Sequence, residues 1–296
     1  APGMNTDLKI LTSPDWVDYQ LLDSGDGLKL ERYGEYILIR PEAEAVWTPK
    51  LPFHVWRQQA HAEFVTTSEK HGGHWKHLKS MPNPWTIQYK HLTFALECKG
   101  SRHVGLFPEQ AEYWDWIIAQ TQAAAQPAKV LNLFGYTGAA TLAAASAGGQ
   151  VAHIDASKRS VTWARRNAER SGLKDAPVRW IVEDALKFAQ REKRRESYYE
   201  GIILDPPKFG RGPNGEVWEF YKLVAQLLQA CADILSPRAK FFALTAYSVK
   251  ASPITLRQAV AELMPPGGRV EAGEITLQEA QTDRLLPTAI FARWSR

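Results

Sequence analysis

Two different spacings of hydrophobic residues divide the chain into two regions. Over residues 15–100, short apolar runs are interrupted by turn residues. The stretch YGEYILIR alternates polar and apolar positions before Pro41, and residues 23–27, DSGDG, supply a turn. Alternation with a period of two, broken by turn residues, is typical of strands. This region therefore predicts a small β-rich domain.

A helical pattern begins at residue 111. In AEYWDWIIAQTQAAA, residues 111–125, apolar residues recur at helical spacing, and Pro127 follows. A proline cannot continue a helix, so it marks the end of the element. We expect a helix that leads into the second region.

Strand and helix patterns then alternate to the end of the chain. Apolar runs that predict strands are KVLNLF, QVAHIDA, VRWIVED, GIILD and AKFFALTAYS. Helical spacing is found in AATLAAASAGG, SKRSVTWARRNAERSG, a charged segment up to Tyr199, and VWEFYKLVAQLLQACADIL. A helix over residues 254–263 and a final strand pair, RVEAGEITLQE and PTAIFARW, complete the series. Such alternation predicts βαβ units around a parallel sheet. We expect an α/β protein with a β-rich domain over residues 1–98 and a second domain over residues 99–296.

Candidate chemistry gathers at the carboxyl ends of the predicted strands. The turn FGYTG, residues 134–138, follows the first strand, and its glycines let the backbone approach a ligand while amides at the helix start face a carboxylate or phosphate. Asp155, Asp184 and Asp205 end the next three strands. Asp155 comes about 20 residues after the turn, a position that suits hydrogen bonds to both hydroxyls of a ribose. Because these ends meet at one crevice, we expect a nucleotide-type site, although a helix N-cap would explain any one of the acids.

The glycine turn also argues against a dehydrogenase. GYTG contains two glycines, whereas the dinucleotide fingerprint is Gly-x-Gly-x-x-Gly. A ligand without a pyrophosphate is therefore favoured.

Four motifs carry a family resemblance. LNLFGYTG, HIDASKRSVTWARRNAERSGL, VEDALKF and ILDPPKF together resemble the class I S-adenosylmethionine-dependent methyltransferases of the 23S ribosomal RNA (cytosine-C5) methyltransferase-like group. The resemblance extends from about residue 99 to the end, and LKLERYGEYILIRPEAEAVW and HVGLFPEQ are similar to the group's small N-terminal domain and joining segment. It implies a Rossmann-like, seven-stranded sheet that binds S-adenosylmethionine.

By residue match, the resemblance implies that the loop 134–138 holds the methionine part of the cofactor, Asp155 the ribose and Asp184 the adenine ring. Gln110 would reach the amino-acid end, although a polar residue at a helix start explains it equally well. The residues expected around the cofactor are Gln110, Asn132, Phe134, Gly135, Tyr136, Thr137, Gly138, Asp155, Ala156, Ser157, Asp184, Ala185 and Asp205.

The stretch DPPKF predicts the acceptor side of the site. Pro206 and Pro207 fix an extended backbone that has no amide protons, directly after Asp205 at the strand tip. Such a ledge can grip the edge of a flat base, with Phe209 available to stack on it. Taken alone, the stretch is explained as well by a strand terminator with an aromatic plug. The expected catalytic residues are Asp205, Pro206, Pro207, Lys208, Phe209 and Tyr247.

Lys208 and the missing cysteine bear on the reaction. Enzymes that methylate exocyclic amines usually place the aromatic residue directly after the prolines, so the intervening Lys208 favours the RNA-type group. Cytosine-C5 members attack the base with a cysteine thiolate that follows the fifth strand in a Thr-Cys-Ser context. The matching stretch here is LTAYSVKAS, without a cysteine. Cys231 lies in an apolar helical stretch, and nothing marks Cys98 as a stabilised thiolate. Direct transfer to a nitrogen or oxygen is therefore open, with Asp205 or Tyr247 as a base.

Composition narrows the setting. The chain has no apolar run of about 18 residues and no secretory pattern at its start, and its two cysteines lack the spacing of a zinc or disulfide site. We expect a cytoplasmic protein with no membrane contact. The formal net charge of +4 divides into −3 over residues 1–120 and +7 over residues 121–296, which hints at an acidic partner for the second region.

For two charged stretches, exposure to solvent is the favoured interpretation. His71, His74 and His77 do not make a recognised ligand set, so we expect no metal and a solvated basic loop in KHGGHWKHLK. The basic residues of QREKRRES are expected to be solvated, with RNA contact as the lesser alternative.

Together these features predict an S-adenosylmethionine-dependent methyltransferase that acts on a base of ribosomal or other structured RNA, in the processing of ribosomal RNA. The alternatives are a small-molecule or protein methyltransferase, and an inactive S-adenosylmethionine-binding RNA chaperone or assembly factor.

Overall fold

Packing divides the chain into two units. The computed structural model describes residues 6–13, 16–68 and 72–296. A large unit comprises the chain up to Leu11, Glu112–Ile275 and Thr288–Arg296, and a small unit comprises Thr12–Ala111 and Thr276–Pro287. The sequence predicts domains over residues 1–98 and 99–296. A domain is a part of the chain that folds independently, so this division stays a prediction.

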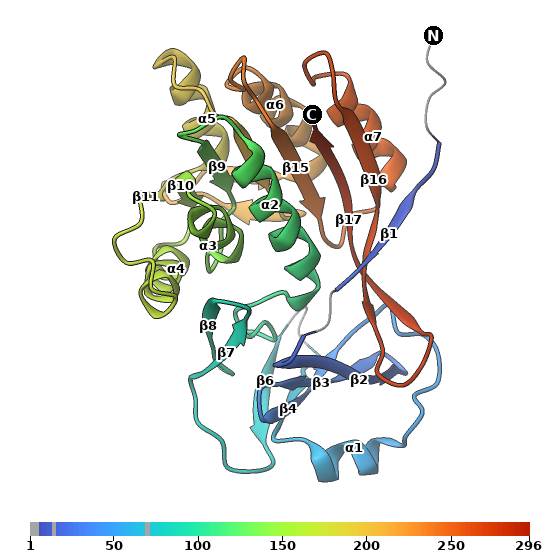
Figure 1. Ribbon diagram of the computed structural model, residues 1–296. Coiled ribbons are helices and arrows are strands. Elements are labelled where there is room, and N and C mark those ends of the chain that lie inside the picture. Colours follow the sequence, from blue (N-terminus) through green and yellow to red (C-terminus); the bar gives the residue numbers. More distant parts are fainter. Residues whose placement is uncertain (1–5, 14–15, 69–71) are drawn as a thin grey trace. The chain divides into compact units, whose positions relative to one another are not determined.

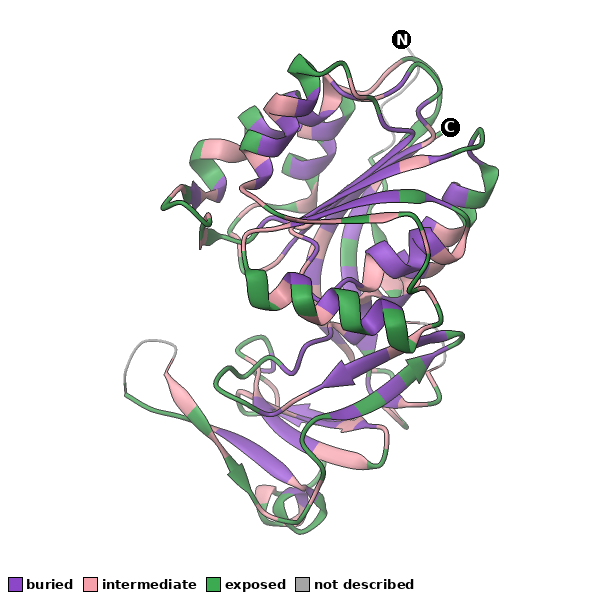
Figure 2. Ribbon diagram, turned by 90° about the vertical axis from the view of Figure 1, so that its left-hand side faces the viewer, coloured by how far each residue is buried: buried purple, intermediate pink, exposed green. Residues whose placement is uncertain are grey.

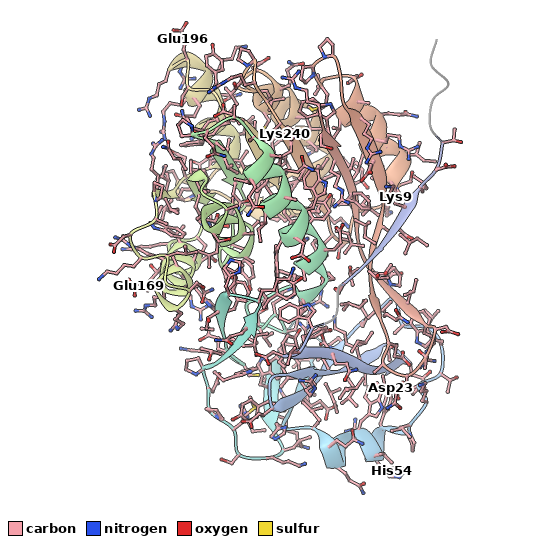
Figure 3. All side chains as sticks on the ribbon, in the orientation of Figure 1. Lys9, Asp23, His54, Glu169, Glu196 and Lys240 are labelled. Atoms are coloured by element: carbon pink, nitrogen blue, oxygen red, sulfur yellow. The ribbon has the colours of Figure 1, made fainter. Side chains whose placement is uncertain are left out.

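The large unit is built on a mostly parallel sheet (Figure 1). Among the described residues its strands lie in the order β1 (Lys9–Thr12), β16 (Arg269–Gln278), β17 (Leu285–Ser295), β15 (Phe241–Ala246), β12 (Gly201–Leu204), β9 (Lys129–Leu133), β10 (Gln150–Asp155) and β11 (Val178–Val182). Strands β15, β12, β9, β10 and β11 pair in parallel, and β17 pairs antiparallel with β15. The predicted α/β sheet is confirmed, with β1 added at its edge. Lys9 of β1, labelled in Figure 3, bridges Glu271 of β16 at 2.7 Å.

Helices cover both faces of this sheet. They are α2 (Ala111–Ala123), α3 (Ala139–Ser146), α4 (Lys158–Arg170), α5 (Ala185–Arg194), α6 (Phe220–Ala232) and α7 (Pro253–Ala261). Alternate residues of β15 point to opposite faces. Phe241 packs against Trp116 of α2, whereas Phe242 belongs to the core that includes Leu227 of α6. Burial on both faces explains why β15 is apolar almost throughout. Figure 2 shows the strands of this sheet coloured mostly as buried.

One predicted helix begins later than the sequence suggested. The helix expected from Val217 starts at Phe220, because Val217–Glu219 forms strand β14, paired with β13 (Phe209–Arg211). Trp218 is buried between the exposed Val217 and the half-buried Glu219, which is the alternation of a strand. In the part of the chain that the structure describes, no helix is both long enough and apolar enough to cross a membrane.

The register of the sheet brings several loops to one edge. Leu204 of β12 pairs with Leu133 of β9 and Leu244 of β15, and Ile154 of β10 also pairs with Leu133. Because these strands are parallel, the loops that follow them open on the same side. The chain runs from β9 to β10 and β11 on one side and then returns to β12 on the other side of β9, so the strand order reverses between β9 and β12. Ligands of open α/β sheets bind at such a switch point.

The small unit is β-rich, as expected. One sheet contains β2 (Tyr19–Gly25), β3 (Leu28–Tyr33), β4 (Tyr36–Pro41), β5 (Ala62–Thr66) and β6 (Gly73–His77), and a second contains β7 (Trp85–Tyr89) and β8 (Leu92–Leu96). In the described part of the small unit, two short helical elements, α1 (Phe53–Gln59) and η1 (Pro108–Gln110), accompany them. Asp26 and Gly27 join β2 to β3 with φ of 48° and 80°, the turn that Asp-Gly favours in a hairpin.

The prediction of a basic loop in KHGGHWKHLK is wrong over residues 73–77. These residues form β6 and pair with β5, so His74 and His77 lie on a strand. His71 lies outside the described residues.

A buried ion pair crosslinks β3 and β4 of the small unit. Arg40 donates from Nε to Glu31 Oε1 at 2.7 Å and from Nη2 to Oε2 at 3.1 Å. The hydroxyls of Tyr19 and Tyr33 also donate to Oε2. Burial by itself would raise the pKa of Glu31, but the charge of Arg40 and these hydrogen bonds lower it to about 2.

We predict that Glu31→Gln destabilises the small unit by about 3–5 kcal/mol, because it leaves the Arg40 charge buried without its counter-ion. Urea unfolding at pH 7 measures this loss. The matched control is Glu63→Gln, which breaks a pair with the half-exposed Arg57 and is expected to cost under about 1 kcal/mol. Since the pKa of Glu31 is lowered from 4.5 to about 2, its contribution is present above pH 4.5 and is lost as the pH falls toward 2. Equal losses of unfolding free energy for the two variants would contradict the stabilising role of the buried Glu31–Arg40 pair.

Candidate functional site

The glycine loop after β9 has a constrained backbone. Phe134, Tyr136 and Gly138 have φ of 59°, 52° and 91°. The Gly135 amide donates to the carbonyl of Ile154 at 2.9 Å, which ties the loop to β10. A Cβ on Gly135 would lie 2.3 Å from Cε1 of His153. The loop therefore rests directly on the His153 ring, and only glycine fits at this position.

A buried hydrogen-bonded chain supports the loop from within the domain. Asn132 Nδ2 donates to Thr141 Oγ1 at 2.9 Å, and Thr141 Oγ1 lies 2.7 Å from His153 Nδ1. Because Thr141 accepts from Asn132, its own proton can be donated to Nδ1. Burial lowers the pKa of His153 to about 3, an effect that the Tyr136 backbone partly opposes. The imidazole is therefore neutral, and a direct cofactor contact by the buried Asn132 stays a prediction.

The start of α3 suits a ligand carboxylate. Gly138 is the N-cap and has no side chain to cap the helix, and the first turn contains no acidic residue. Amides at an uncapped helix start, together with the helix dipole, favour a negative group. Ala139 and Ala140 at this start are half-buried and small, so a ligand can approach the backbone closely.

Asp155 links the glycine loop to the next strand. Its Oδ2 accepts from the amide of Tyr136 and its Oδ1 from the amide of Ser157, both at 2.9 Å. Burial raises the pKa of Asp155, whereas the amides of Ser157 and Tyr136 act in the opposite direction. Each carboxylate oxygen has a second lone pair, so the group can still accept from ribose hydroxyls.

Two of the predicted cofactor residues are helix caps. The Asp184 carboxylate accepts from the amide of Lys187 and is the N-cap of α5, and the Ser157 hydroxyl accepts from Ser160 at the start of α4. The cap role that the sequence suggested for Asp184 is confirmed. Ala156 is half-buried and Ala185 is buried beside these caps. Contacts of these residues with the cofactor stay predictions.

The ledge after β12 is fixed from two sides. Thr245 at the end of β15 donates from Oγ1 to Asp205 Oδ1 at 2.8 Å, which orients the carboxylate. The indole Nε1 of Trp218 donates to the carbonyl of Pro207 at 2.6 Å. The Trp218 ring also packs edge-on against Phe134, with centroids 5.3 Å apart. One buried side chain thus joins the ledge to the glycine loop.

Trp218 was missed by the sequence analysis. The signal was present: Pro213, Asn214 and Gly215 are turn residues between two short runs, a pattern that predicts a hairpin. The long helical pattern that follows Phe220 obscured it.

The remaining candidates are less closely placed. Tyr247 is half-buried directly after β15, and Lys208 is exposed. Gln110 lies in η1 of the small unit, so its contact with the cofactor stays a prediction. Among the described residues, no group of three His, Cys, Asp or Glu side chains is placed to hold a metal ion.

Neither cysteine is suited to nucleophilic attack. Cys98 and Cys231 are both buried free thiols. Burial raises the pKa of Cys98 to about 12, although the charge of Arg40 acts against the shift, and burial raises the pKa of Cys231 as well. A thiol becomes nucleophilic as the thiolate, so both are inert at neutral pH.

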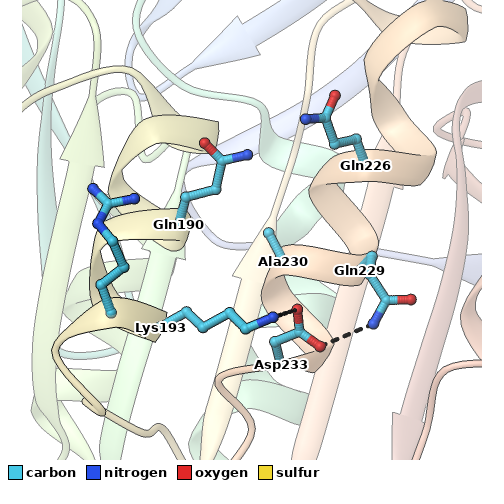
Figure 4. A pocket seen from close by; sticks show the side chains of 7 residues that line it. Gln190, Lys193, Gln226, Gln229, Ala230 and Asp233 are labelled. Atoms are coloured by element: carbon cyan, nitrogen blue, oxygen red, sulfur yellow. Dashed lines mark hydrogen bonds and ion pairs between the residues drawn. The ribbon is translucent and has the colours of Figure 1, made fainter.

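A surface hollow lies between α5 and α6 (Figure 4). It is lined by Gln190, Lys193, Arg194, Gln226, Gln229, Ala230 and Asp233, and Lys193 bridges Asp233 at 2.9 Å. Both helices begin at the carboxyl ends of the strands, and these residues lie toward the helix ends. The hollow is therefore at the opposite edge of the sheet from Asp155 and Asp205.

Comparison with known proteins identifies the family of the chain. The model of the S-adenosylmethionine-dependent methyltransferase family matches residues 67–262. A solved S-adenosylmethionine-dependent methyltransferase from Agrobacterium tumefaciens is 46% identical, with a TM-score of 0.92 and coverage of 97% of this chain and 93% of that one.

Curated relatives include two ribosomal RNA methyltransferases. Ribosomal RNA large subunit methyltransferase I of Aeromonas salmonicida is 27% identical over 156 residues, which cover 52% of this chain and 36% of the relative. Ribosomal RNA large subunit methyltransferase K/L of Shewanella frigidimarina is 36% identical over 110 residues, which cover 36% of this chain and 15% of the relative. The chain thus spans well under half the length of these relatives.

The uncapped start of α3, the acids at successive strand tips and the family match over residues 67–262 agree with one another. The chain belongs to the S-adenosylmethionine-dependent methyltransferase family.

Proposed function

We propose that the chain transfers a methyl group from S-adenosylmethionine to a base of ribosomal or other structured RNA. The observation that carries the proposal is the pairing of two loops at the switch point of the sheet. The glycine loop follows β9, the Asp205 ledge follows the adjacent β12, and Trp218 contacts both. A donor loop and an acceptor ledge held together in this way favour alignment of two reactants.

The proposed roles combine the geometry of the groups with the family resemblance, which alone assigns Asp184 to the adenine. Amides at the start of α3 would hold the cofactor's carboxylate, Asp155 its ribose hydroxyls and Asp184 the adenine. When bound, S-adenosylmethionine supplies a methyl group on a positively charged sulfur. The carbonyls and rigid backbone of Pro206 and Pro207 would grip the acceptor, and Asp205, oriented by Thr245, would accept its proton.

We propose direct transfer rather than covalent attack on the base. Both cysteines are buried, with pKa values above the usual range, and residues 245–248 contain no thiol. A nitrogen or oxygen acceptor needs only alignment and a base, for which Asp205 and the half-buried Tyr247 are available.

RNA is the proposed substrate because two independent features agree. The curated relatives are named as ribosomal RNA large subunit methyltransferases. Residues 121–296 carry a net charge of +7, which favours a polyanion. Work on ribosomal RNA in the cytoplasm is part of this proposal, and the two free thiols fit a reducing compartment.

Incubation with tritium-labelled S-adenosylmethionine and total RNA tests the proposal. We expect label in RNA, and nucleoside analysis identifies the methylated base. Parallel reactions with protein and small-molecule extracts examine the other acceptor classes. Label in one of those extracts but not in RNA would contradict the RNA assignment.

Asp155→Asn is predicted to weaken S-adenosylmethionine binding about 10- to 100-fold, because hydrogen bonds to a charged carboxylate are lost. Isothermal titration calorimetry measures the affinity. Asp175→Asn makes the same charge change at an exposed turn of the large unit and is expected to bind normally. Normal binding by Asp155→Asn would remove that residue from the cofactor site.

Asp205→Ala is predicted to lower methyl transfer at least about 100-fold, since the acceptor loses its base and its alignment. Affinity for S-adenosylhomocysteine should change little, because Asp205 acts on the acceptor. The label assay and calorimetry separate the two effects, with Asp175→Ala as control. Full activity in Asp205→Ala would exclude the ledge from the reaction.

A further inference from the structure

The hairpin β13–β14 has two unlike faces. Gly210 pairs with Trp218, and their side of the hairpin packs on Pro207 and Phe134. Alternation along each strand places the neighbours of these two residues on the opposite face. Phe209 and Arg211 of β13 therefore share the outward face with Val217 and Glu219 of β14.

The outward face carries two exposed apolar side chains, which lie on a diagonal of the hairpin. Phe209 retains 52% of its accessible surface and Val217 retains 45%. The guanidinium carbon of Arg211 lies 5.7 Å from the centroid of the Phe209 ring. A flat ring beside a guanidinium offers two surfaces on which a base can stack.

The hairpin is held in a fixed position. Its inner face is anchored by the hydrogen bond from Trp218 to Pro207. The amide of Phe220 donates to the carbonyl of Lys208 at 2.9 Å, which closes the hairpin at its base. Lys187 of α5 bridges Glu216 in the turn at 2.9 Å. The outward face is therefore preorganised and has little conformational entropy to lose on binding.

The charges on this face and directly next to it favour an anion. Among the described residues, neither Lys208 nor Arg211 forms an ion pair, and both are exposed. Glu219 is the acid on the face, and Lys222 neutralises it at 2.6 Å. At the basic end of α5, by contrast, three of the four cations, Arg191, Lys193 and Arg195, already bridge acids. Net positive charge is thus available at the hairpin.

We propose that the outward face of the hairpin, Phe209, Arg211 and Val217 with the adjacent Lys208, binds the single-stranded nucleotides that flank the methylated base. Phe209 stacks on a neighbouring base rather than on the acceptor, because its ring lies on the face opposite Trp218 and Phe134. Arg211 and Lys208 contact the phosphates. This assignment rests on the proposed RNA substrate and adds that the protein selects single-stranded RNA.

Single strands are favoured over duplex RNA and over a protein partner. An aromatic ring can stack only on a base that is not already stacked in a helix. A surface that binds a protein partner more often has a larger apolar patch. This face has one aromatic ring, one aliphatic side chain and two cations that form no ion pair among the described residues.

Fluorescence anisotropy with a fluorescein-labelled single-stranded RNA of about 16 nucleotides tests the inference. Phe209→Ala is expected to weaken binding about 5- to 100-fold, and Phe209→Trp to retain it, because stacking needs a ring. Arg211→Ala should reduce the slope of log affinity against log salt concentration by about one. A duplex RNA of the same sequence should bind more weakly, and Phe209→Ala should change its affinity less.

Two controls lie at the opposite edge of the sheet. Tyr198, which is 42% exposed just before β12, and the exposed Arg194 provide Tyr198→Ala and Arg194→Ala. Both should leave affinity and salt slope unchanged, and urea unfolding verifies that every variant is folded. Equal binding by wild type and Phe209→Ala, or equal losses for Tyr198→Ala, would overturn the docking face while leaving the proposed methyltransferase function intact. Wild-type protein that binds neither form of RNA would overturn both the docking face and the proposed RNA substrate.

Discussion

The hydrogen bond from the Trp218 indole to the Pro207 carbonyl is the constraint on which the site depends. Proline supplies no amide proton, so the chain after Asp205 cannot be fixed by donating its own backbone hydrogen bonds. The segment is fixed because the Pro207 carbonyl accepts a hydrogen bond. Because Trp218 is nearly fully buried and also contacts Phe134, a displacement of the ledge would disturb the glycine loop, and the reverse. The hairpin β13–β14 places this side chain, which gives an otherwise peripheral element a role at the centre of the site.

The glycine loop is constrained from the other side by packing. Gly135 lies against a His153 ring that burial keeps neutral, and Thr141 orients that ring. A charged imidazole beneath the loop would need a counter-ion, whereas a neutral ring only fills volume and satisfies a hydroxyl. The loop is therefore supported without adding charge beneath it, which suits the cationic cofactor that we propose for this loop. Negative charge beside the loop comes from Asp155, whose two oxygens anchor the amides of Tyr136 and Ser157.

The elements with long, regular patterns could be predicted from sequence, and the short irregular ones could not. The strands ending at Leu133, Asp155 and Leu204 are apolar runs followed by turn residues or prolines, so their tips and their shared edge were correctly inferred. Strand β14 was absorbed into a helix because three residues carry too little periodicity to compete with the thirteen of α6. Strand β6 was missed for a different reason: its residues are polar and depend on pairing with β5, a nonlocal contact.

The contacts within the site were also beyond the sequence, since they join residues far apart in the chain. Nothing near Thr245 indicates that it donates to Asp205, 40 residues earlier. That contact bears on the mechanism. In the group that the chain resembles, the end of the fifth strand carries a nucleophilic thiol; here the same strand end carries a hydroxyl that orients a carboxylate. A thiolate activates the base by forming a covalent bond to it, whereas the proposed role of the oriented carboxylate is to accept a proton as the methyl group is transferred. The acceptor must then be nucleophilic by itself, which favours a ring or exocyclic nitrogen, or an oxygen, over carbon 5 of a pyrimidine.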